Sequence, residues 1–314
     1  MDSESTTPDF LPEDSVFITN EALPLYAVWG SNITAVGGKN INTQSTSDVF
    51  GDGSVIYTPQ TARDKAVLTL NNAHIVAYPV VGVSEETGIY TNTDIEIMLV
   101  GDNIIETENA NAIGILSDGS ITFSGDGSLA VRAAGSGYYA TGVKAKNVDV
   151  YSKNIYITDC KTGFYGAAAL YDGTTEIYAR NYKGSGFKTF TQPFAEDPDE
   201  PMCVIGTSNV NNSASKLSGA SAAMNANYVL IAPENKPLIH YNADRKTIIP
   251  VCNKNGTLIF ANYDETGKTK NIKTITQNFA NKETTVTELS IGDKIFFWES
   301  FDTLKPLCEA FTVK

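Results

Sequence analysis

Residues 94–107 read DIEIMLVGDNIIET and residues 120–131 read SITFSGDGSLAV, two segments of the same design. Each starts with a short strand of alternating apolar and polar residues, turns at a Gly-Asp corner, and continues into a second short strand. Related segments occupy residues 66–77, 147–158 and 175–184. Equivalent points, spaced by about 27 residues, are Leu68, Ile95, Ile121, Val148 and Ile177.

A second marker precedes the later units and adds a third short strand to each. It reads Gly88-Ile89-Tyr90, Gly114-Ile115-Leu116, Gly142-Val143-Lys144 and Gly163-Phe164-Tyr165. Alternation gives every unit one apolar side, which so small a unit cannot bury alone; stacking units about 4.8 Å apart buries it. We therefore expect an all-β chain with a right-handed parallel β-helix of about five to six capped coils. An antiparallel sandwich is the rival, although it has no reason to keep a fixed period.

The chain divides into three parts by pattern. Residues 1–14 form an acidic segment, and residues 15–233 form the β-helix, with residues 15–42 as its N-terminal cap. After Pro233 the period is lost and tighter turns separate the strands. Residues 234–314 are therefore expected to form a small antiparallel β-sandwich of the immunoglobulin or fibronectin type, with Trp298 in its core.

The composition excludes some classes of function. A net charge of −13 should repel polyanions, so nucleic acid is not expected as a partner. No apolar run approaches the roughly 18 residues of a membrane span, so membrane insertion is not expected. The start of the chain lacks the features of a signal peptide, so the protein is either cytoplasmic or exported with its signal removed. The cysteines are widely spaced, and a Cys252–Cys308 disulfide and buried thiols both stay open.

Two segments resemble known proteins. VFGDGSVIY and AVLTLNNAHI, within residues 26–75, followed by coils of the GDN and GDGSLAV type, resemble secreted parallel β-helix proteins of gut clostridia that are labelled carbohydrate-binding. IFFWESFDTLKPLCEAFTV, residues 295–313, looks like a C-terminal β-sandwich module of clostridial cell-surface proteins. The resemblance implies an extracellular or cell-surface protein that binds a glycan, and it supplies no binding residues.

The Asp-Gly corners raise the question of a Ca²⁺ site. Ca²⁺ needs six to eight converging oxygens, whereas each corner offers one carboxylate. Asp followed by Gly is also what a tight turn requires, because Asp bonds the local backbone and Gly accepts positive φ. Turns are the simpler interpretation; Asp102 and Asp126, placed at equivalent corners of adjacent coils, are the weak candidates for a shared ion.

Parallel β-helices include polysaccharide lyases, so catalysis has to be considered. A pectate-lyase type of site needs clustered carboxylates for Ca²⁺ and a basic residue, and the nearest approach is Asp172, Glu176 and Arg180. Glu96 and Asp149 should share an outward column with Thr122 between them, about 9.6 Å apart, near the range of an inverting glycosidase. Neither pattern marks an acid or base, and we expect no enzyme activity.

Outward tyrosines suit a binding surface, because the apolar side of a sugar ring stacks on a flat aromatic ring. The candidate ligand-binding residues are Tyr90, Tyr156, Tyr165 and Tyr178. The alternative is that they are ordinary strand residues covering neighbouring coils. The expected function is non-catalytic binding or adhesion at the cell surface with a polysaccharide as leading ligand. A structural surface protein with a protein partner and a Ca²⁺-dependent polysaccharide lyase are the alternatives.

Overall fold

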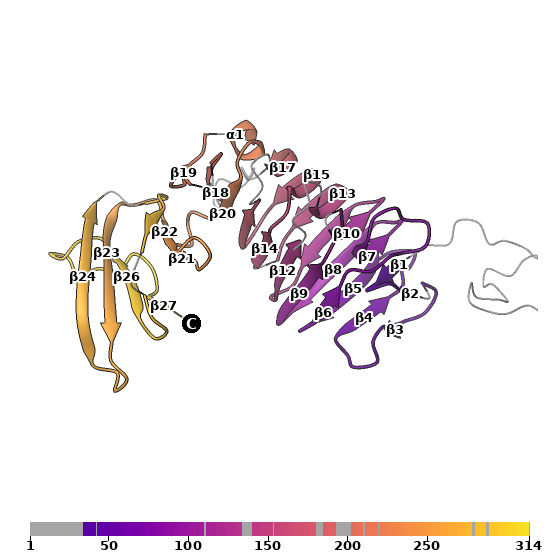
Figure 1. Ribbon diagram of the computed structural model, residues 1–314, viewed down its shortest axis with the longest axis horizontal. Coiled ribbons are helices and arrows are strands. Elements are labelled where there is room, and N and C mark those ends of the chain that lie inside the picture. The colour runs from indigo at the N-terminus through magenta and orange to yellow at the C-terminus, as the bar shows by residue number, and fades with distance from the viewer. Residues whose placement is uncertain are drawn as a thin grey trace, which may run out of the picture.

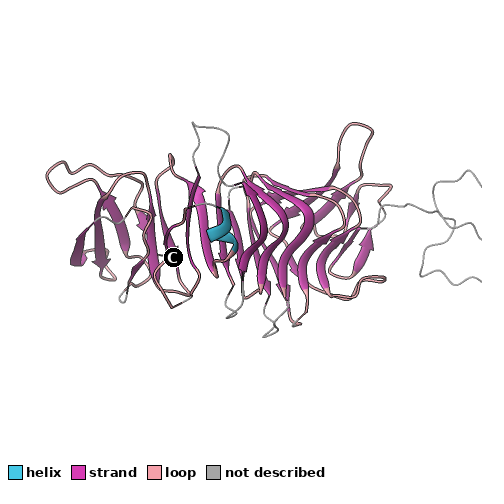
Figure 2. Ribbon diagram, turned by 90° about the horizontal axis from the view of Figure 1, so that it is seen from above, coloured by secondary structure: helices cyan, strands magenta, loops and turns pink. Residues whose placement is uncertain are grey.

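The computed structural model describes residues 34–41, 43–109, 111–133, 140–152, 154–179, 185–192, 202–209, 211–218, 220–277, 280–286 and 289–313. The chain is all-β apart from one short helix, α1 (Ala220–Met224). Its N-terminal part is a β-solenoid of about four turns, and its C-terminal part consists of antiparallel sheets (Figure 1). Seen from above, the solenoid strands stack side by side along the long axis of the molecule (Figure 2).

Each turn of the solenoid contributes strands to three faces. The first face stacks β7 (Thr87–Thr91), β10 (Ile113–Ser117) and the first halves of β13 (Thr141–Val150), β15 (Thr162–Leu170) and β17 (Ser185–Gln192). The second face stacks β5 (Ala66–Asn71), β8 (Ile95–Val100), β11 (Ile121–Ser124) and the second halves of β13, β15 and β17. The third face stacks β6 (His74–Val76), β9 (Asp102–Thr107), β12 (Ser128–Ala133), β14 (Asn154–Thr158) and β16 (Thr174–Tyr178). All these neighbours are parallel, which confirms the predicted type of fold.

The predicted register is right in the middle of the solenoid and wrong at its ends. Ile121 pairs with both Ile95 and Val148, as expected. At the start, however, Ala66 rather than Leu68 is the partner of Ile95. Ile177 belongs to the third face, where it pairs with Ile157, so it is not equivalent to Val148. The cause at Ile177 is that the long strands β13 and β15 each cover two faces and shorten the repeat.

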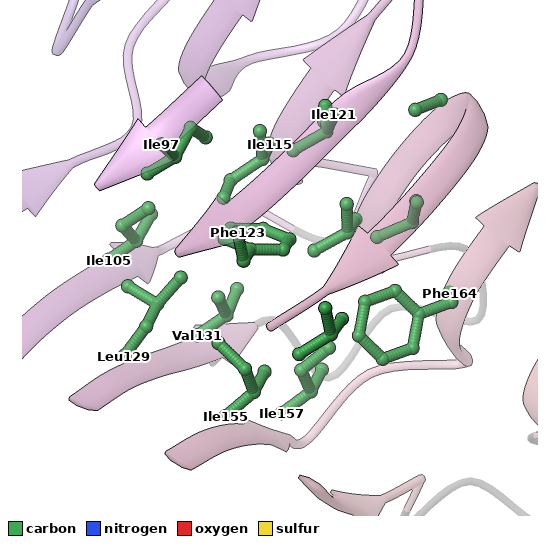
Figure 3. Packing of buried hydrophobic residues seen from close by; sticks show 14 of the residues in the cluster. Ile97, Ile105, Ile115, Ile121, Phe123, Leu129, Val131, Ile155, Ile157 and Phe164 are labelled. Atoms are coloured by element: carbon green, nitrogen blue, oxygen red, sulfur yellow. The ribbon is translucent and has the colours of Figure 1, made fainter. Parts of the chain in front are cut away.

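The inward residues of the three faces form one continuous core. Figure 3 shows Ile115 of the first face, Ile97 of the second and Ile157 of the third projecting into the same interior. All three are fully buried, as is Phe123. Full burial of a side chain of this size stabilises by roughly 1.5–3 kcal/mol, and the stack repeats this gain at every turn.

The Gly marker of each unit has a steric cause. Gly114 lies in the first face where it approaches the third face, and an added Cβ would lie 2.3 Å from Val131 Cγ1 and 2.6 Å from the Gly142 carbonyl oxygen. Gly88, Gly142 and Gly163 meet equivalent neighbours in their own turns. The repeated glycine therefore allows two faces of a narrow solenoid to meet at close range.

The parallel ladder ends in antiparallel strands on both sides. At the N-terminal side these are β1 (Thr34–Val36), β2 (Lys39–Ile41), β3 (Ser47–Asp48) and β4 (Val55–Thr58). At the other side, β20 (Tyr228–Pro233) pairs with β16 and is followed by β18 (Met202–Thr207) and β19 (Ser215–Lys216). Most of the predicted N-terminal cap, including residues 15–33, lies outside the described residues, as do residues 1–14.

Two antiparallel sheets follow, consistent with a sandwich. One contains β21 (Leu238–Asn242), β22 (Thr247–Val251) and β25 (Thr284–Thr285); the other contains β23 (Gly256–Tyr263), β24 (Thr269–Gln277), β26 (Lys294–Trp298) and β27 (Phe311–Thr312). Ile248 of the first sheet and Phe297 of the second belong to the same buried cluster. Trp298 alternates with Phe297 and is half-exposed on the opposite side of its sheet, which corrects the expectation of a core residue.

The described cysteines are free thiols, so the structure contains no Cys252–Cys308 disulfide. Cys252 and Cys308 nevertheless contribute to the same core cluster of the C-terminal sheets. Burial, with the neighbouring Cys252 as a second cause, raises the pKa of Cys308 to about 12. These thiols therefore act as small apolar side chains.

A buried polar junction joins the solenoid to the C-terminal sheets. Glu176 of β16 lies 3.1 Å from His240 Nε2 and accepts a hydrogen bond from Asn242, both on β21. Arg245 donates to both carboxylate oxygens of Glu283, at 2.7 and 2.8 Å. An apolar cluster formed by β18, β20 and β22 surrounds these contacts, so the C-terminal sheets pack on the last solenoid strands.

Candidate functional site

The second face carries an exposed pair of aromatic rings. Tyr151 and Tyr171 directly follow the inward residues Val150 and Leu170, which are paired in register, so the two tyrosines occupy adjacent turns. Their ring centroids are 4.4 Å apart and their planes differ by 3°. The residues are 49% and 37% exposed, so a stacked aromatic pair faces solvent.

Polar side chains form the next column of the same face. Thr122 pairs in register with Glu96 on one side and Asp149 on the other, which confirms the predicted column. Ser124 Oγ donates to Glu96 Oε1 at 2.5 Å. The Asp149 carboxylate, by contrast, receives no hydrogen bond or ion pair from any residue that the structure describes.

The aromatic pair and the Asp149 carboxylate are close enough to interact. Burial raises the pKa of Tyr151, and Tyr171 and then the charge of Asp149 raise it further. Lys65, in the loop before β5, reaches the same place and donates from Nζ to Thr122 Oγ1 at 3.4 Å. We call Tyr151, Tyr171, Glu96, Thr122 and Asp149 the tyrosine–carboxylate surface. It combines exposed aromatic rings with hydrogen-bond acceptors, the combination that a sugar ring and its hydroxyl groups require.

The first two predicted ligand-binding residues lie on the first face. Tyr90, Leu116, Lys144 and Tyr165 follow one another in register, so Tyr90 and Tyr165 share a column as expected. Tyr165 is 44% exposed and has Lys144 Nζ 5.8 Å from its ring centroid. Tyr90 is half-buried and donates to Asp118 Oδ2 at 3.0 Å. Leu116 and Lys144 separate the two rings, so they form no shared platform.

The other two predicted residues lie on the third face and are largely covered. Burial, followed by the charges of Glu176 and Asp102, raises the pKa of Tyr156 to about 12. Tyr178 packs edge-to-face against Tyr228 with a centroid distance of 6.1 Å, and the Arg245 guanidinium lies 5.6 Å from its ring centroid. Tyr178 therefore packs against residues of the junction.

The two candidate metal ligands are not equivalent in the structure. Asp102 pairs in register with Ser128, whose hydroxyl donates to it at 2.7 Å, whereas Asp126 lies two residues earlier, in the turn before β12. Within the described residues, no group of three or more His, Cys, Asp or Glu side chains is arranged to hold a metal ion. At these corners positive φ is found at the glycines that precede the aspartates, Gly101 and Gly125, and not at Gly127 after Asp126, where the Asp-Gly pattern predicts it.

The two described residues of the lyase alternative, Asp172 and Glu176, have different partners. Asp172 pairs with Lys236 at 3.3 Å, and Glu176 is buried in the junction. Arg180 lies outside the described residues. Of the two histidines, His74 is exposed and lies 3.0 Å from Glu106, while His240 is buried beside Glu176.

The described part of the chain contains no helix long and apolar enough to cross a lipid bilayer. The comparison of the sequence with protein-family models, with curated proteins and with solved structures finds no match in any of the three.

Proposed function

We propose that this protein is a non-catalytic binding protein of the cell surface or extracellular space, and that its ligand is a polysaccharide or surface glycan. The observation that carries the proposal is the exposed, stacked pair Tyr151 and Tyr171, whose ring planes are nearly parallel, beside the acceptors Glu96 and Asp149. Exposed aromatic rings lose little entropy on binding and offer a large apolar area, so they suit a weakly apolar ligand such as a sugar ring.

The finer architecture belongs to the same proposal. We propose a right-handed β-helix whose antiparallel end strands act as caps, followed by a sandwich of the immunoglobulin or fibronectin type. Caps are needed because unpaired strand edges invite association with other chains. A long, capped solenoid face supports an extended polymer better than a closed pocket would.

Affinity electrophoresis through a panel of neutral and charged polysaccharides, with and without Ca²⁺, tests the function. Retardation by at least one polymer, reduced by Tyr151→Ala and by Tyr171→Ala, is the expected result. Tyr78→Ala is the matched control, because Tyr78 is 62% exposed and lies outside the tyrosine–carboxylate surface. Unchanged mobility in every polymer would exclude the proposal for that panel. If the protein, incubated with the same polymers, releases products whose double bonds absorb ultraviolet light, a lyase would be favoured.

A protein partner is the second candidate function, and one observation favours it. Phe296, Trp298 and Phe301 form a row of edge-to-face rings on the C-terminal sheets, with centroids 6.2 and 6.4 Å apart. Clustered aromatic residues of this kind are enriched at protein interfaces.

A further inference from the structure

The tyrosine–carboxylate surface has a charge that distinguishes between classes of glycan. Glu96 and Asp149 flank Thr122 at the two neighbouring turns, so the backbone positions of the two acids are separated by about 9.6 Å, two strand spacings. Among the described residues, no cation forms an ion pair with either carboxylate. Two negative charges therefore face solvent beside the exposed rings.

An ammonium group already occupies the space between these two positions. Lys65 Nζ donates to Thr122 Oγ1, in the middle of the column, from the loop before β5, which lies two strands away from β11 along the second face. The lysine ammonium is compact, carries three donors and is attached to a flexible stem, so a ligand can displace it at small cost. The position thus has the size and polarity that a primary ammonium requires.

We infer that the tyrosine–carboxylate surface binds glycans that carry free amino groups, such as polymers with glucosamine units that are not acetylated. This inference rests on the proposed glycan-binding function. A sugar ring stacks on the side of the Tyr151 ring that faces away from Tyr171, and its ammonium replaces Lys65 Nζ at Thr122 between Asp149 and Glu96. Polymers of uronic acids are disfavoured, because both the surface and the chain, with a net charge of −13, are acidic.

Calorimetric titration of the full chain with glucosamine oligosaccharides tests the inference, using N-acetylglucosamine oligosaccharides of the same length as the matched probe. The amino form should bind at least about tenfold more tightly, since acetylation removes a charged donor. Asp149→Asn should weaken binding of the amino form about tenfold. Lys65→Gln should strengthen it, because the internal competitor is removed.

Asp302→Asn is the control, since Asp302 is an exposed acid of the C-terminal part and its loss changes the net charge equally. It should leave the affinity unchanged. If both oligosaccharides bind equally and Tyr151→Ala abolishes binding, the glycan-binding function stands and the selectivity for amines is wrong. Equal losses for Asp149→Asn and Asp302→Asn would also overturn it, because net charge would then be the cause. If no oligosaccharide and no polysaccharide of the panel binds, both proposals fail.

Discussion

Removal of one partner from the junction ion pair should destabilise the protein far more than loss of an exposed pair. The side chains of Arg245 and Glu283 are only 7% and 1% exposed, and Glu283 also accepts a hydrogen bond from the Ala214 backbone at 2.6 Å. Glu283→Gln keeps the shape of the side chain but leaves the guanidinium charge buried without its partner. Breaking a buried pair in this way costs about 3–5 kcal/mol.

Urea denaturation followed by circular dichroism measures this loss as a change in the free energy of unfolding. Lys236→Ala is the control, because its pair with Asp172 is about half exposed and should contribute about 1 kcal/mol or less. Adding Arg245→Met to Glu283→Gln should recover part of the loss, since it removes the orphaned charge. A loss for Glu283→Gln no larger than the control, or a double variant less stable than Glu283→Gln, would refute the reasoning.

Three further predictions concern the core and the pH dependence. Gly114→Ala should lower the free energy of unfolding, measured by urea denaturation, by about 1–3 kcal/mol, because the new Cβ collides with Val131. A loss below about 0.5 kcal/mol would contradict the close approach of the first and third faces. Phe123→Ala should cost about 3–5 kcal/mol through lost burial and a cavity, and a cost near zero would mean that the core is not packed as described. Burial raises the pKa of Glu176 and of Glu283, but their hydrogen-bonding partners outweigh it and the net shift is downward from 4.5. The contribution of these two carboxylates to the free energy of unfolding is therefore fully present above about pH 4.5 and is lost as the pH falls through their lower folded-state pKa. Glu283→Gln should flatten the acid side of a plot of unfolding free energy against pH. An unchanged acid side would contradict the role of Glu283 in this loss of stability.

The type of fold could be predicted because the solenoid repeats its steric requirements in every turn. Inward positions such as Ile95 and Ile121 recur with apolar residues, and Gly114 and Gly142 recur where the faces meet. The register failed at Ile177, where the repeat shortens. In β13 the corner between the two faces is marked only by a change of phase in the alternation, with the consecutive exposed residues Lys146 and Asn147, and by no Gly or Pro.

The candidate site could be predicted only in part. The column of Glu96 and Asp149 followed from alternation and register within the solenoid. The contacts that cover Tyr178 could not be predicted in this way, because they involve Arg245 and Tyr228, which lie far along the chain. Tyr151 and Tyr171 were missed since both lie just beyond alternating strand segments and their spacing is shorter than the 27-residue repeat. Tyrosines that directly follow an inward apolar residue in consecutive turns would have been the signal.

The solenoid separates the residues that specify the fold from those that are free to specify a ligand. Most inward positions carry apolar residues because the core is shared by all turns. Outward positions carry no such restriction. Two outward aromatic rings can stabilise the fold by stacking on each other, and this does not require that either ring leave one side open to solvent. In the column of Tyr151, the neighbour on one side is Tyr171 and the neighbour on the other is the small residue Ser124. An aromatic ladder serving only stability would gain from a third ring at that position; a serine there instead leaves one side of the Tyr151 ring without an aromatic neighbour, where a sugar ring can stack.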